Sequence, residues 1–113
     1  MEHIPLSSAD KFEKGVVTSW EYVTQSELMN VALIRIDGRY PDSGYMINRE
    51  VDSIVQVTVG EGVLGVADGS TVRLSKYDQV HIQKDEAYYF EGNLEIIYAA
   101  TPKWTPEQTT QVD

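Results

Sequence analysis

The chain has 113 residues, with nine basic and eighteen acidic side chains that give a formal net charge of −9. This length suits one domain, and the negative charge argues against nucleic acids and anionic membrane surfaces as partners. The absence of cysteine excludes disulfides, thiolate metal ligands and cysteine nucleophiles. No segment resembles a signal peptide or is apolar enough to span a membrane. We therefore expect a soluble, cytoplasmic protein.

The N-terminal residues 1–15 are polar and contain Pro5 and Gly15, so we interpret them as an N-terminal arm. From Val16 onward, short runs of β-branched and aromatic residues alternate with Gly, Pro, Asp and Asn, which is typical of β-strands and turns. The predicted strands span residues 16–23, 30–37, 45–48, 54–59, 63–67, 71–74, 80–82, 88–91 and 94–100. No amphipathic helix interrupts them. The sequence therefore predicts an all-β sandwich or barrel.

Three glycine-containing segments are predicted turns. Asp68-Gly69 lies between two strand patterns and favours a two-residue hairpin, because both positions tolerate a positive φ. Residues 60–62 are predicted to form a tight bend, and Gly92-Asn93 is predicted to reverse the chain in the last hairpin. These turns divide the chain into short strands of similar length.

The C-terminal segment begins with residues 101–106, whose two prolines prevent pairing as a central strand. Trp104 is expected to fold back onto the body of the domain. We expect residues 109–113 to fray as a C-terminal tail. The barrel domain would then span residues 16–108.

The order of strands and turns resembles a small single-domain cupin, a jelly-roll β-barrel also called a double-stranded β-helix. Residues 53–62 are similar to the second half of the first cupin motif, and residues 74–82 to the start of the second. Residues 101–108 resemble the ending of a subgroup that lacks the usual metal-binding histidines. The resemblance covers residues 31–108 and implies a cupin barrel with an N-terminal arm and a tail containing Pro and Trp. It implies no single function, because this fold hosts isomerases, epimerases, oxygenases, sensors and storage proteins.

The resemblance also shows where a metal-binding cupin would carry its histidines and glutamate. Those positions fall on Ser53, on Tyr88, and on Met46 and Asn48, or on Ile47 and Arg49 if the spacing is shorter. None is a histidine or a carboxylate, the ligands that hold a transition metal in such a barrel. The family's metal site is therefore not carried over, and we predict neither a metal nor another cofactor.

A different metal site is the alternative. Asn48, Glu50 and Asp52 alternate, so on an uninterrupted strand they would share a face and offer oxygen ligands to a hard cation. The competing interpretation places Glu50 and Asp52 in a solvated bend between two strands. His81 lies between Val80 and Ile82 and is expected to face solvent if those two residues point inward.

Six residues are predicted to line the mouth of the barrel and to bind a small organic molecule, such as a sugar or a planar metabolite. They are Tyr45, Met46, Asn48, Tyr88, Tyr98 and Trp104. Equally, these side chains could fill the barrel, as they commonly do in small barrels. A further alternative is an isomerase or epimerase that uses Tyr88 and a carboxylate. Glu50 or Asp52 could be that carboxylate only if burial raised its pKa.

Apolar residues expected outside the barrel, including Ile54 and Ile97, are compatible with a homodimer. A third hypothesis is therefore that the chain is mainly a dimerising or sensory accessory domain. It would then act through a separate partner.

Overall fold

The computed structural model describes all 113 residues and consists almost entirely of one antiparallel sheet. Its strands are β1 (Asp10–Lys14), β2 (Val17–Tyr22), β3 (Asn30–Tyr40), β4 (Tyr45–Asn48), β5 (Asp52–Val66), β6 (Thr71–Leu74), β7 (Gln79–Ile82), β8 (Ala87–Thr101) and β9 (Thr109–Val112). Two 3₁₀ turns, η1 (Leu6–Ser8) and η2 (Pro106–Gln108), are the only helical elements. Neither could cross a membrane, and the structure has no longer helix.

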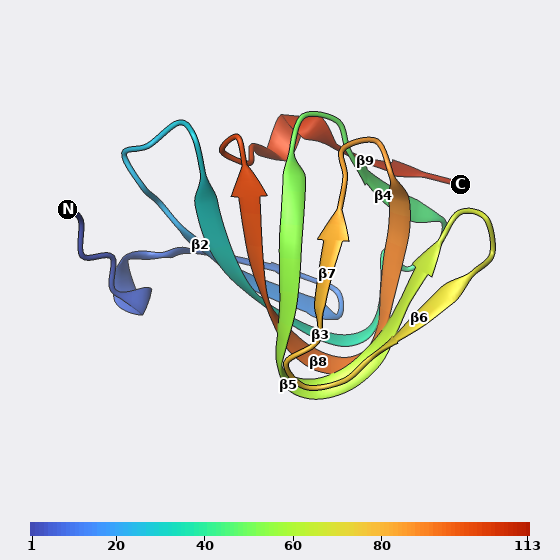
Figure 1. Cartoon of the computed structure of the whole chain (residues 1–113). Coiled ribbons are helices and arrows are strands. Elements are labelled where there is room, and N and C mark those ends of the chain that lie inside the picture. The colour runs from blue at the N-terminus through green and yellow to red at the C-terminus, as the bar shows by residue number, and fades with distance from the viewer.

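Two strands of 15 residues, β5 and β8, organise the sheet by pairing with each other and bending together. Strands β3 and β4 follow one another along the free edge of β8, and β9 pairs with β4. Strands β7 and β6 follow one another along the free edge of β5. In Figure 1 the ribbons of β5 and β8 turn at the bottom of the view and rise again. The sheet therefore curls into two facing walls, with β1 and β2 extending one of them.

Glycines make the shared bend possible. Gly60 and Gly92 have positive φ angles of 81° and 144°. A Cβ atom on Gly92 would collide with the backbone of Glu61 and Gly62, and one on Gly60 would collide with the carbonyl of Asn93. The chain bends at residues 60–62 as predicted, but the prediction that Gly92-Asn93 reverses it in a hairpin is wrong. These two segments pair with each other inside long strands and bend them, because only glycine permits this backbone approach.

The core lies between the two walls and follows the alternation of each strand. Val55 and Val57 on β5 and Leu94 and Ile96 on β8 are almost completely buried. Trp104 packs against this core, which confirms that the segment after β8 folds back. A hairpin at Asp68-Gly69 joins β5 to β6 as predicted, but its turn is longer than two residues, because β5 ends at Val66 and β6 begins at Thr71, and of the two only Gly69 has a positive φ.

The sheet extends beyond both predicted ends of the barrel domain. Residues 10–14 of the predicted arm form β1, which pairs with β2. The prediction that residues 109–113 fray is wrong, because residues 109–112 form β9 on the edge of β4. The chain reaches that edge after η2, where Gln108 is buried. Three of the four residues of β9 are β-branched, and the edge of β4 offers backbone groups with which they pair.

Candidate functional site

A buried polar network closes the barrel at the end opposite the glycine bend. The side-chain amide of Asn48, the last residue of β4, donates hydrogen bonds to the Tyr98 hydroxyl at 2.8 Å and the Tyr88 hydroxyl at 3.1 Å. The two tyrosines lie on opposite limbs of β8, and all three residues are at most 7% exposed. Asn48 therefore connects the two walls of the barrel.

The direction of these hydrogen bonds follows from the groups that donate to the side-chain oxygen of Asn48. The Trp104 indole N–H can only donate, and it donates to the Thr109 hydroxyl at 2.8 Å. The Thr109 hydroxyl donates in turn to Oδ1 of Asn48 at 2.8 Å. The Gln108 side-chain oxygen accepts from the Glu50 backbone N–H, so its amide nitrogen also faces Oδ1 of Asn48, at 3.2 Å. The amide nitrogen of Asn48 must then face the two phenols, and both phenol oxygens are acceptors here.

Five of the six residues predicted to line the mouth of the barrel are on its inward face. Most of them are buried and fill the interior instead of lining an opening. Met46, Asn48, Tyr88 and Tyr98 are buried, and Trp104 is half-buried beside them. The centre of the barrel is thus packed with side chains.

Tyr45 is the exception among the predicted residues. Side chains alternate along β4, so Tyr45 lies on the face opposite Met46 and Asn48. Its ring packs outside the barrel against the ring of Tyr89, with 5.9 Å between the ring centroids. The prediction that Tyr45 lines the mouth is wrong.

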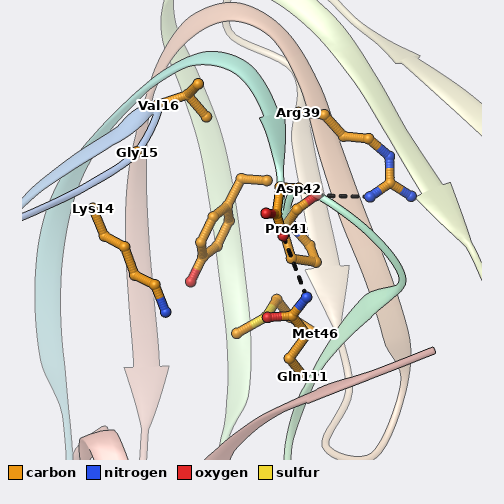
Figure 2. A pocket seen from close by; sticks show the side chains of 9 residues that line it. Lys14, Gly15, Val16, Arg39, Pro41, Asp42, Met46 and Gln111 are labelled. Carbon is orange, nitrogen blue, oxygen red and sulfur yellow. Dashed lines mark hydrogen bonds between the residues drawn. The ribbon is translucent and has the colours of Figure 1, made fainter.

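An open cavity of about 170 Å³ lies beside this packed centre. Figure 2 shows Lys14, at the end of β1, on one side of it and Gln111 of β9 on the other. Arg39 is at its edge, but the guanidinium binds the carbonyls of Pro41 and Gly44 at 2.7 and 3.0 Å and lies over the ring of Tyr89. The residues that line the cavity are Lys14, Gly15, Val16, Arg39, Tyr40, Pro41, Asp42, Met46 and Gln111.

Tyr40 connects the cavity with the buried network. Its ring lines the cavity, and burial raises the pKa of its hydroxyl above the ordinary value. The negative charge of an ionised Tyr40 would raise the pKa of both Tyr88 and Tyr98. The three phenols therefore occupy one region of the interior. Burial raises the pKa of Tyr98 to about 12, and it raises that of Tyr88 further. All three phenols therefore remain protonated hydrogen-bond donors near neutral pH.

Glu21 is a functional candidate that the sequence interpretation missed. It lies on the inward face of β2, opposite Asp10 of β1. Burial, and secondly the negative charge of Asp10, raises the pKa of the Glu21 carboxyl to about 7. This carboxyl consequently changes charge near neutral pH.

The pattern of β2 hides Glu21, because its largest apolar residues, Trp20 and Tyr22, lie on the outer face. Thr109 and Gln108 were missed for another reason: they belong to a polar C-terminal segment that has no strand pattern. Tyr40 lies between Gly38 and Pro41, beyond the predicted strand 30–37, although β3 continues to it. No local signal identifies these residues as neighbours.

The proposed oxygen-ligand metal site is not assembled. Strand β4 ends at Asn48 and β5 begins at Asp52, so the uninterrupted strand on which this alternative depended does not exist. Glu50 and Asp52 are exposed, and Asp52 accepts a hydrogen bond from the Lys84 backbone. No three His, Asp or Glu side chains are close enough together to hold a metal ion. His81 is exposed on β7, as predicted.

Comparison with solved structures identifies the architecture. Pac13 from Streptomyces, a nucleoside dehydratase, superposes with a TM-score of 0.88 and 13% identity over 99% of this chain and 91% of that chain. Ectoine synthase from P. lautus has a TM-score of 0.78 and 15% identity over 100% and 91% of the two chains. KdgF from Halomonas sp. has a TM-score of 0.74 and 14% identity over 95% and 97%. All three are cupin-fold proteins. This chain has the cupin fold.

The expected jelly-roll cupin barrel is thereby confirmed. No family model and no curated protein sequence matches the chain. The likeness to these proteins therefore concerns their fold, and a shared fold does not define the chemistry of a site.

The raised pKa of Glu21 predicts how the stability of this protein varies with pH. Between about 4.5, the ordinary value of a glutamate, and about 7, the folded state holds a proton that the unfolded state has lost. The free energy of unfolding should therefore fall as pH rises through this range and level off above it. Because Glu21 is partly exposed, we expect a contribution of only about 1 to 2 kcal/mol after solvent screening.

Chemical denaturation at a series of pH values measures this effect. Glu21→Gln should remove this part of the pH dependence and be more stable than the parent at pH 8. Glu13→Gln, which changes an exposed carboxyl of the same hairpin, should leave the pH dependence unchanged. Parallel curves for the parent and Glu21→Gln would show that Glu21 titrates normally.

Proposed function

We propose that this cupin binds a small polar organic molecule in the cavity between the β1–β2 turn and β9, without a metal. The observation that supports this most directly is the cavity itself, which has the Tyr40 phenol in its wall beside an otherwise filled barrel. Ligand sites generally combine an apolar wall with a few polar groups that orient the ligand. Here Met46, Pro41 and the Tyr40 ring supply the apolar part.

The polar groups around the cavity indicate the kind of ligand. Lys14 offers a positive charge and donors, and Asp42 offers an acceptor, although Asp42 is already 3.5 Å from the Gln111 amide. A phenol with a raised pKa donates its hydrogen to a carbonyl or hydroxyl oxygen of the ligand. The size of the cavity limits the ligand to a small metabolite. We therefore favour a hydroxylated compound that carries a carbonyl or another acceptor oxygen.

The similar structures support small-molecule binding as a use of this fold. Besides the nucleoside dehydratase and the synthase, they include the polyketide cyclase RemF from Streptomyces resistomycificus, at a TM-score of 0.77 and 12% identity over 100% of this chain and 86% of that chain. Pac13 variants have been solved with uridine.

Thermal unfolding in the presence of sugars, sugar phosphates, nucleosides and small hydroxy acids tests the proposal. A ligand that binds only the folded state raises the unfolding midpoint, by an amount that grows with its concentration. Tyr40→Phe should weaken binding about five- to tenfold, the effect of losing one hydrogen bond. EDTA should not alter the shift.

Tyr89→Phe is the matched control, because it removes a phenol from the outer face of the same barrel. It should leave the affinity unchanged. If no compound shifts the midpoint, or if both variants weaken binding equally, the cavity is not the binding site.

The homodimer stays a prediction. Ile54 and Ile97 are 42% and 38% exposed and lie on adjacent strands of the outer face. An apolar outer face of this kind is what a symmetric pair of sheets would bury.

A further inference from the structure

The cavity has a positive charge that no carboxylate of the chain neutralises. Lys14 ends β1 and pairs with Val17, which packs against the core, so both side chains lie on the inward face. Figure 2 shows the Lys14 side chain pointing from β1 toward the side of the cavity where Met46 and Gln111 lie. Lys14 is in none of the four ion pairs of the chain, although Asp42 lines the same cavity. Its ammonium group is therefore free to bind a ligand.

Arg39, the second cation at the cavity, is already occupied. Tyr40 pairs with the buried Phe90 and faces inward, so Arg39, one residue earlier on β3, faces outward. Its guanidinium donates to the carbonyls of Pro41 and Gly44 and lies 4.0 Å from the centroid of the Tyr89 ring. The positive charge that a ligand meets inside the cavity is thus that of Lys14.

The other polar groups of the cavity are one donor and two acceptors. The Tyr40 hydroxyl has no hydrogen-bond partner in the chain, so its hydrogen can bind a ligand oxygen. The Gln111 amide nitrogen donates to the Ser43 carbonyl at 2.9 Å and lies 3.5 Å from the Asp42 carboxylate. The side-chain oxygen of Gln111 and most lone pairs of Asp42 therefore remain unused. A ligand that suits all these groups carries negatively charged oxygens for the ammonium and hydroxyl groups for the two acceptors.

We propose that the ligand is a small hydroxylated anion, held by an ion pair between its carboxylate or phosphate group and the Lys14 ammonium. This inference rests on the proposed binding function, and it names Lys14 as the residue that selects a charged ligand over a neutral one. With a net charge of −9 the chain as a whole repels anions, so such selectivity must come from a local cation.

Matched compounds separate the effect of the charge from that of the hydroxyl groups. Glycerol, glycerate and glycerophosphate form one set, and sorbitol, gluconate and sorbitol phosphate form another. The unfolding midpoint at a series of concentrations, with ionic strength held constant by sodium chloride, gives the affinity for each. We expect a charged member of at least one set to bind about tenfold more tightly than its neutral counterpart, the effect of one charge-assisted hydrogen bond. The tighter of the two charged members identifies the anionic group as a carboxylate or a phosphate.

Lys11→Gln is the matched control for Lys14→Gln. Both variants remove one positive charge from β1, but Lys11 lies on the outer face, where it pairs with Glu13 at 2.9 Å and approaches the Trp20 ring. Lys14→Gln should weaken binding of the anion about tenfold and bring it to the level of the neutral compound. Lys14→Arg should retain most of the affinity, and Lys11→Gln should leave it unchanged. Higher salt should weaken binding of the anion only.

The outcomes separate this inference from the proposed function. Tighter binding of a charged compound that is lost in Lys14→Gln and kept in Lys11→Gln supports both. If the neutral compound binds as tightly as the charged ones, and Tyr40→Phe weakens it, the role of Lys14 is overturned and the binding function stands. Equal losses in Lys14→Gln and Lys11→Gln mean that net charge governs the binding, which also overturns the inference. If only uncharged compounds of the thermal screen bind, the inference fails alone; if nothing binds, both proposals fail.

Discussion

Replacing Asn48 with alanine is expected to lower the free energy of unfolding by about 3 to 5 kcal/mol. The substitution removes four hydrogen bonds, to Tyr88, Tyr98, Gln108 and Thr109, inside a region that water scarcely reaches. Buried polar groups that lose their partners each cost free energy, and the connection between the two limbs of β8 is lost as well. Urea denaturation, with the slope checked for a two-state transition, measures the change.

Asn93→Ala is the matched control for this experiment, because Asn93 is an exposed residue of β8. It should change the free energy of unfolding by less than about 0.5 kcal/mol. Tyr98→Phe removes a single hydroxyl from the same network and should cost about 1 kcal/mol. An effect of Asn48→Ala as small as that of Asn93→Ala would show that the network does not hold the two walls together.

Gly92→Ala is expected to destabilise the fold by more than about 4 kcal/mol, or to prevent folding. Two costs combine at this position. Its φ of 144° is unfavourable for any residue with a Cβ, and that Cβ would collide with the backbone of Glu61 and Gly62. The strands β5 and β8 could not remain paired through the bend, and the two walls would separate. Circular dichroism and denaturation of the purified variant measure the loss.

Gly69→Ala distinguishes these costs, because Gly69 also has a positive φ, 91°, but no atom lies within 4 Å of the position of its added Cβ. We expect a loss of about 1 kcal/mol from backbone strain alone. Similar losses for the two variants would mean that the bend tolerates the extra atom, contrary to the close approach of β5 and β8.

Local patterns were sufficient for the parts of this protein that depend on neighbours in sequence. The alternation of apolar residues, the Asp68-Gly69 turn and the two motif-like segments led to an all-β cupin barrel, which the structure and the similar folds confirm. They also led to the inward positions of Asn48, Tyr88 and Tyr98. These features depend on a two-residue period or on the φ angle of a single turn, and both are readable from composition and spacing.

Prediction from local patterns failed at glycines that are compatible either with a chain reversal or with a bend inside a long strand. Gly60, Gly62 and Gly92 are compatible with chain reversals, and in isolation they indicate turns. In the folded chain they are paired with each other, and they bend two long strands instead. Their role depends on a partner strand about 30 residues away, so it could not be decided locally.

The sequence by itself determined the all-β class of fold and the absence of cysteine chemistry. Tertiary structure alone decided that Asn48 bridges two phenols, that β9 completes a wall, and that Lys14 and Tyr40 line one cavity. The physical reason is the same in each case. Hydrogen bonds and desolvation act between side chains that are close in space, and in this barrel those side chains come from strands that are distant in sequence.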